Sequence, residues 1–167
     1  MKSNTEKTFN VLIDPIDQIE DIIFAYGLES QRLDKNQLII NLRGIWSNYE
    51  LSFSFMEDLS LIQLNNDLSM KVPESLVLGL QSMISLINEK LNLGYFGYST
   101  DKRCIYFRYN LFLKGIIEIT TEQVEDLFDS VVYECDKYFP AFQIYLKKKN
   151  DPIYAINTAL LETLGEA

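Results

Sequence analysis

The spacing of apolar residues along the chain switches between the helical and the strand period. Asp14 and Pro15 are suited to the start of a helix, and after them isoleucines recur at steps of three and four residues until Gly27. Because such steps place apolar side chains on one face, this segment predicts a helix that ends at the glycine. Two short strand-like runs, at 28–33 and 37–43, then predict a β-hairpin.

The rest of the chain continues with strands and helices in blocks. The further predicted elements are strands over 49–55 and 59–68, a helix over 73–92, strands over 95–99 and 103–113, a long helix from Thr120 or Thr121, and a short helix over 153–164. Pro140 lies inside the long helix, where we expect a kink because its ring removes a backbone donor. The order α-β-β-β-β-α-β-β-α-α predicts an α+β fold, with an antiparallel sheet and flanking helices.

The length and the start of the sequence bear on domain number and location. With 167 residues, of which 47% are apolar, we expect one domain over 14–167, preceded by an N-terminal arm over 1–13. The polar start lacks the apolar core of a signal peptide, and the longest apolar stretches are too short to span a membrane. These features predict a cytoplasmic protein with no membrane partner.

Composition argues against several kinds of chemistry. The formal net charge of -9 is opposite in sign to the field that attracts phosphates, so we expect no nucleic-acid partner. There is no histidine, and Cys104 and Cys135 are too far apart for a zinc motif, so both are interpreted as buried apolar residues. Acids of the long helix, Asp136 among them, fall largely on its outward face, where solvated charge is expected. The sequence therefore predicts no catalytic residue, metal or cofactor, and we interpret the protein as a non-enzyme.

Two residues stand out as candidates for contact with a partner. Arg108 lies in the middle of an aromatic strand, where its charge must reach water or pair with a carboxylate. A structural ion pair is the favoured interpretation, and contact with a ligand or peptide on an exposed sheet face is the alternative. Trp46 lies in a loop-like stretch, where it either anchors a partner or covers the sheet.

From residue 91 onward the sequence resembles the YbjN family of bacterial sensory transduction regulators, whose fold is similar to that of type III secretion chaperones. The segments that carry the resemblance are Leu91 to Phe96, Arg108 to Gly115, Glu134 to Gln143, and Ala159 to Ala167. The most diagnostic pieces are the Pro-Ala-Phe-Gln segment at 140–143 and the C-terminal ending. The first half of the chain matches only by the order of its elements. The family has no established catalytic residues, so none is carried over to this sequence.

The resemblance implies a homodimer that acts by binding other proteins. In the similar chaperones a central helix builds the dimer, and the outer sheet face and the first helix hold a partner segment. By that analogy, the dimer helix corresponds to the segment over 73–91, which also carries more apolar residues than one sheet face need cover. The residues assigned to the dimer helix are Leu76, Leu80, Met83 and Ile87, and those assigned to the partner surface are Trp46, Tyr49, Phe53 and Arg108.

The leading hypothesis is therefore a non-enzymatic protein- or peptide-binding regulator that works as a homodimer. It rests on the absence of a convergent polar site and on a surplus of apolar and aromatic positions. One alternative is a small-molecule sensor with an apolar cavity between the sheet and the long helix. The other is an enzyme that uses carboxylates and tyrosines, for which ten tyrosines and abundant acid are the motive.

Overall fold

The computed structural model describes residues 14–148 and 151–164, so the predicted N-terminal arm over 1–13 lies outside the described residues. In chain order the elements are α1 (Pro15–Ala25), β1 (Ser30–Asp34), β2 (Gln37–Arg43), β3 (Asn48–Met56), the short 3-10 turn η1 (Glu57–Leu59), β4 (Leu61–Lys71), a second such turn η2 (Glu74–Leu76), α2 (Val77–Asn88), β5 (Tyr95–Ser99), β6 (Cys104–Phe112), α3 (Thr121–Lys148) and α4 (Pro152–Leu164). This order confirms the predicted α+β fold.

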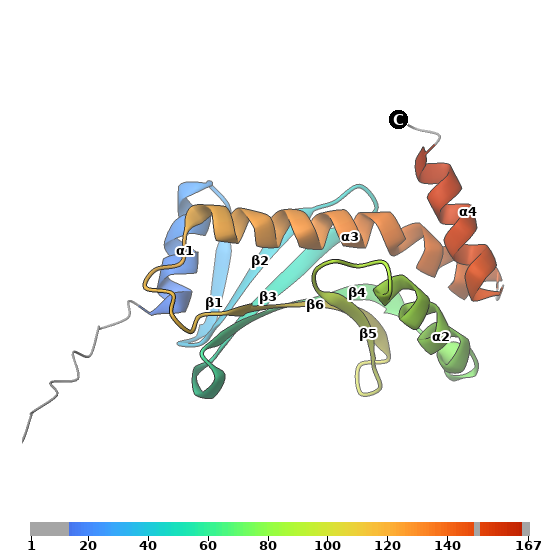
Figure 1. Ribbon diagram of the computed structural model, residues 1–167, viewed down its shortest axis with the longest axis horizontal. Helices are drawn as coiled ribbons and strands as arrows, with labels where there is room; N and C mark the ends of the chain where they lie inside the picture. The colour runs from blue at the N-terminus through green and yellow to red at the C-terminus, as the bar shows by residue number, and fades with distance from the viewer. Residues whose placement is uncertain (1–13, 149–150, 165–167) are drawn as a thin grey trace, which may run out of the picture.

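All six strands form one antiparallel sheet in the order β1-β2-β3-β4-β6-β5. The long helix α3 crosses one side of this sheet, with α1 beside its first turns and α2 and α4 near its other end (Figure 1). None of the described helices crosses the opposite side, which we call the open face. Figure 1 also shows that the sheet arches beneath α3, with the β3–β4 and β5–β6 turns descending at its two ends.

The core lies between the sheet and α3. Alternate residues of each strand point toward α3, because successive strand side chains face opposite sides of a sheet. The four rings of Phe96, Phe107, Tyr138 and Phe142 meet edge to face around Phe96, with centroids 5.0–5.9 Å apart. Each large apolar side chain that is fully buried there contributes about 1.5–3 kcal/mol to stability.

The ends of several elements follow from local contacts. The Asp14 carboxylate accepts a hydrogen bond from the amide of Ile16 at 2.8 Å, as expected of a helix cap, and Gly27 adopts a φ of 68° at the other end of α1. The helix α2 stops at Asn88, earlier than the predicted residue 92. The reason is that the Asn88 side chain bonds the amide and the carbonyl of Phe96, at 2.9 and 3.0 Å, and so joins the helix end to β5.

The helix α3 continues through Pro140 instead of ending there. Pro140 and its neighbours Phe139 and Ala141 are buried, so packing against surrounding residues holds this stretch of the helix. The kink that we expect at this proline stays a prediction. Among the described helices, none carries an apolar stretch that could cross a bilayer.

Candidate protein-binding surfaces

The residues assigned to a dimer helix lie inside the subunit's own core. Leu80, Met83 and Ile87 are fully buried, and Leu76 is partly buried in the turn before α2. The three buried residues cannot form an interface between subunits unless the core opens, so their assignment is corrected, whereas that of Leu76 stays a prediction. The apolar surplus of the segment reflects contact with β5 and α4, and the large apolar side chain that α2 leaves at the surface is Leu78, which is 79% exposed.

Two of the four residues assigned to the partner surface are also buried. Tyr49 and Phe53 point from β3 toward α3, where Phe53 meets the ring of Phe128 edge to face at 6.0 Å. Strand alternation places Ser52 and Ser54 on the open face instead. The analogy with the chaperones thus assigned residues of the buried face of β3 to the partner, and this assignment is corrected for Tyr49 and Phe53.

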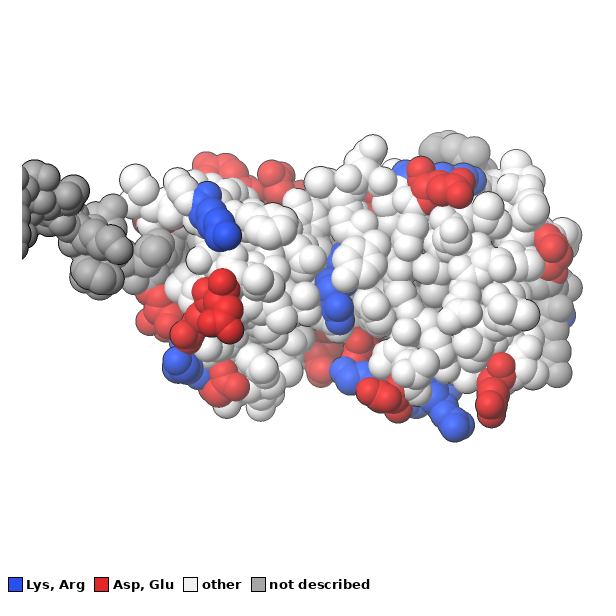
Figure 2. Space-filling model, turned by 60° about the horizontal axis from the view of Figure 1, so that its bottom comes forward, with Lys and Arg blue, Asp and Glu red and all other residues white. Residues whose placement is uncertain are grey.

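Arg108 lies on the open face, as the alternative interpretation of the sequence required. Cross-strand register aligns Ser52, Asn65, Arg108 and Tyr95 in one row across β3, β4, β6 and β5. Figure 2 turns this side toward the viewer and shows a broad, mostly uncharged area with basic colour at its centre and acidic side chains toward the margins. The centre of the open face therefore carries a basic side chain among uncharged ones.

The guanidinium of Arg108 is held by neutral groups. Its Nε donates to Asn65 Oδ1 at 3.3 Å, one terminal nitrogen donates to the Tyr95 hydroxyl at 3.4 Å, and the group lies 4.7 Å from the centre of the Tyr106 ring. Within the described part of the chain, no ion pair includes Arg108. The predicted structural ion pair is therefore wrong for the described residues.

An apolar row crosses the same face at the end nearest the β3–β4 turn. Met56, Leu61 and Phe112 are cross-strand neighbours on β3, β4 and β6. Leu61 is covered by its neighbours, whereas Phe112 is 66% exposed and Met56 is 40% exposed. An exposed phenylalanine beside other apolar side chains is typical of a surface that contacts another molecule.

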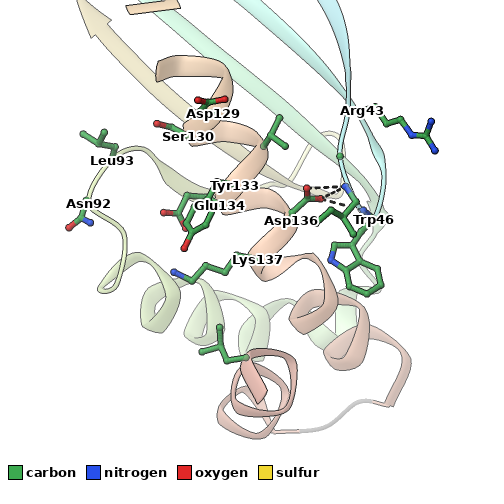
Figure 3. Close-up of a pocket in the computed structure, with 14 residues that line it drawn as sticks. Arg43, Trp46, Asn92, Leu93, Asp129, Ser130, Tyr133, Glu134, Asp136 and Lys137 are labelled. Atoms are coloured by element: carbon green, nitrogen blue, oxygen red, sulfur yellow. Dashed lines mark hydrogen bonds between the residues drawn. The ribbon is translucent and has the colours of Figure 1, made fainter. Parts of the chain in front are cut away.

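Trp46 lies on the other side of the molecule, in a loop that α3 holds in place. The buried Asp136 carboxylate of α3 accepts from the Ile45 amide at 2.9 Å and from the Trp46 amide at 3.3 Å (Figure 3). It also accepts from the Tyr49 hydroxyl at 2.7 Å. The pKa of the Tyr49 hydroxyl is raised far above its usual value, mainly by burial and secondly by its hydrogen bond to Asp136. Asp136 thus points inward, which corrects the outward position that its helical spacing predicts.

A broad hollow lies beside α3 near this loop. It has a volume of about 1440 Å³ and is bordered by Trp46, Leu93, Tyr133 and Lys137 (Figure 3). Trp46 is 45% exposed at this rim, and its role as a partner anchor stays a prediction. The sensor hypothesis places a cavity between the sheet and α3, whereas this hollow lies outside that layer, which the core side chains occupy.

The carboxylates of this hollow do not form a pair suited to catalysis. Asp136 is occupied by the three donors of the loop and of Tyr49. Burial raises the pKa of Glu134, and its Oε2 has no hydrogen-bond partner among the described residues. In the parts of the chain that the structure describes, no group of three acidic or cysteine side chains could hold a metal ion.

Both cysteines are free and buried, and we expect them to react slowly in the native protein. Burial raises the pKa of the Cys135 thiol to about 12, so little reactive thiolate is present at pH 8. Ellman's reagent should label the native chain slowly and the urea-unfolded chain fast at both thiols. A Thr100→Cys variant, with its new thiol in an exposed turn, is the positive control. Fast native labelling of Cys104 or Cys135 would contradict their buried positions.

Comparisons with known proteins were made by sequence and by fold. The sequence profile of the YbjN family, described as "Putative bacterial sensory transduction regulator", matches residues 15–143. No curated protein matches the sequence. Neither the family description nor the similar structures name an enzymatic activity.

Solved structures share the fold, among them the two that follow. The crystal structure of YbjN from E. coli, whose title calls it a "putative transcription regulator", has a TM-score of 0.56 and 16% identity, and the match covers 79% of this chain and 96% of that one. The crystal structure of the ExsC–ExsE complex has a TM-score of 0.53 and 13% identity, and covers 81% and 94%. ExsC is a type III secretion chaperone, so the predicted likeness to that fold is confirmed.

Proposed function

We propose that this chain, which belongs to the YbjN family, is a non-enzymatic regulatory module that holds a segment of a protein partner on the open face of its sheet. The observation that carries the proposal is a sheet that the described helices cover on one side only, with a hydrogen-bonded arginine and an exposed phenylalanine on the other. A sheet face without a cover, lined by groups of fixed geometry, suits an extended or helical peptide.

The comparison with ExsC supports a protein partner. That chaperone of similar fold was crystallised in complex with the protein ExsE. At 13% identity the likeness concerns the fold, so the partner and the contact residues of this chain have to come from its own surface. The homodimer and the cytoplasmic location stay predictions, and sedimentation at micromolar concentration tests the first of them.

The test uses a random peptide library displayed on phage, selected against the immobilised full chain. We expect selected peptides to bind wild type and to bind a Ser52→Tyr variant at least about tenfold more weakly, because the added ring occupies the open face beside Asn65. Ser85→Tyr makes the same change on the exposed side of α2 and should leave binding within about twofold. Circular dichroism of both variants checks that they fold.

Two results would overturn the proposal. One is a library from which no binding peptide is enriched on the wild-type chain. The other is a set of peptides that bind Ser52→Tyr and wild type equally but lose affinity for Trp46→Ala. That result would assign binding to the hollow beside α3, where Trp46 lies.

A further inference from the structure

We infer that the open face selects a partner segment carrying a carboxylate, which binds Arg108, and a large apolar side chain about 14 Å away, which packs on the row of Met56, Leu61 and Phe112. The spacing comes from the four residue-to-residue steps between Arg108 and Phe112 along β6, at about 3.4 Å for each step. This inference rests on the proposed function and specifies its ligand. It commits to an acidic, partly apolar peptide as the occupant of the face.

The charge of Arg108 is not balanced at close range. Its described contacts are an amide oxygen, a hydroxyl group and an aromatic ring, all of them neutral, and they use two of the five guanidinium N–H donors. The remaining donors belong to the planar end of the group, which matches the two oxygens of a carboxylate. An arginine that is already held by two hydrogen bonds and a ring contact loses little further conformational freedom when such a ligand binds.

The carboxylate of Asp67, two residues along β4 from the partner of Arg108, is already occupied. Asp67 accepts from Lys102 in an ion pair and from Asn65 Nδ2 at 2.8 Å. Asn65 faces Arg108 with its oxygen and Asp67 with its nitrogen, so it stands as a neutral spacer between the cation and the anion. The chain therefore keeps Arg108 available in a molecule whose own formal charge is -9. This arrangement favours an incoming carboxylate over any anion of the chain itself.

The apolar row supplies the second point of contact. Phe112 and Met56 are exposed on it, and Leu59, 53% exposed, extends the apolar area into the β3–β4 turn. Between this row and Arg108 lie Gln63 and Asn110, which bond each other at 3.2 Å and carry no charge. A ligand that spans the two points needs a carboxylate and an apolar side chain about four residues apart in an extended peptide, or about nine apart in a helix.

The experiment begins with the phage-selected peptides and compares their sequences. We expect Asp or Glu to be enriched at one of these two spacings from Phe, Leu, Met or Trp. Isothermal titration then pairs one selected peptide and its Glu→Gln version with the wild-type chain and with Arg108→Gln. Each single change should weaken binding at least about tenfold. The two changes together should cost little more than one, since they remove the same contact.

Matched variants separate the contact from net charge and from folding. Arg103→Gln removes the same charge from the exposed β5–β6 turn and should leave affinity within about twofold. Arg108→Lys keeps the charge but loses the planar fork, so an intermediate loss is expected. Phe112→Ser should lower the affinity for the selected peptides, and the loss should grow with the size of the apolar residue in the peptide. Because the Glu→Gln change lies in the peptide, it tests the inference even where a variant protein fails to fold.

The possible failures differ from those of the proposed function. One such result is a set of peptides whose binding is lost in Ser52→Tyr but is unchanged by Glu→Gln in the peptide and by Arg108→Gln in the chain. It would overturn this inference and leave the open face as a binding site. A chain whose self-association is abolished by Ser52→Tyr, and which enriches no acidic peptide, would identify a second copy as the occupant and would also overturn it. Loss of binding in both Arg108→Gln and Arg103→Gln would attribute the effect to net charge and count against a specific contact.

Discussion

Replacing Asp136 by alanine is expected to lower the free energy of unfolding by about 3 kcal/mol. The substitution leaves the amides of Ile45 and Trp46 and the hydroxyl of Tyr49 without their acceptor, and an unsatisfied buried donor costs about 1–3 kcal/mol. Part of this cost is offset because the variant no longer buries a charge. Urea unfolding followed by circular dichroism measures the change.

The tryptophan reports on the same substitution. Trp46 is the only tryptophan in the chain, and its amide is one of the groups that Asp136 holds. In native Asp136→Ala we expect its emission to shift to the red and its quenching by acrylamide to increase, because the loop is released. Asp129→Ala removes an exposed acid from the same helix and should change stability by less than about 0.5 kcal/mol. Equal urea midpoints for the two variants would show that the Asp136 contacts add no stability.

The course of the fold could be predicted where the determinants are local. The cap at Asp14, the end of α1 at Gly27 and the alternation in β6 each depend on residues a few positions apart, and the structure confirms all three. Along β6, Phe107 points toward the core and Arg108 points outward, as the strand period requires. Short-range rules are sufficient for such features.

The contacts of the candidate site depend on residues distant in sequence, and there the predictions failed. Asp136 bonds groups about 90 residues away, so its helical position alone suggests a solvated acid. The surroundings of Arg108 come from β4 and β5, and only the strand order places Asn65 and Tyr95 on either side of it. An isolated sequence supplies no such pairing, which is why an ion pair was the simpler expectation.

The buried stripe of α2 illustrates a third kind of error. An apolar helix face predicts that something covers it, but not whether the cover belongs to the same chain. Here β5 and α4 provide it, and Asn88 fixes the helix end to β5 through Phe96. The assignment of Leu80 to a dimer came from analogy between folds, and the position of α4 in this chain decides against it.

Gly94→Ala is expected to destabilise the chain by about 3 kcal/mol. Gly94 has a φ of 68°, a conformation that costs an alanine about 1–2 kcal/mol. Its added Cβ would also overlap the ring of Phe107 and lie 2.9 Å from the carbonyl oxygen of Arg108. The Phe107 ring is buried against Phe96, with centroids 5.0 Å apart, and so has little room to move. Crowding of this kind adds about 1–3 kcal/mol.

Gly27→Ala separates the two causes. Gly27 has the same φ of 68° but nothing within 4 Å of its added Cβ, so only the backbone cost of about 1–2 kcal/mol applies. The difference between the urea midpoints of the two variants therefore measures the crowding at Phe107. A destabilisation of Gly94→Ala no greater than that of Gly27→Ala would contradict a close approach of Gly94 to β6. The added Cβ of Gly94→Ala would press on the backbone carbonyl of Arg108. A Gly94→Ala chain that still folds should therefore also bind the acidic peptides more weakly than wild type.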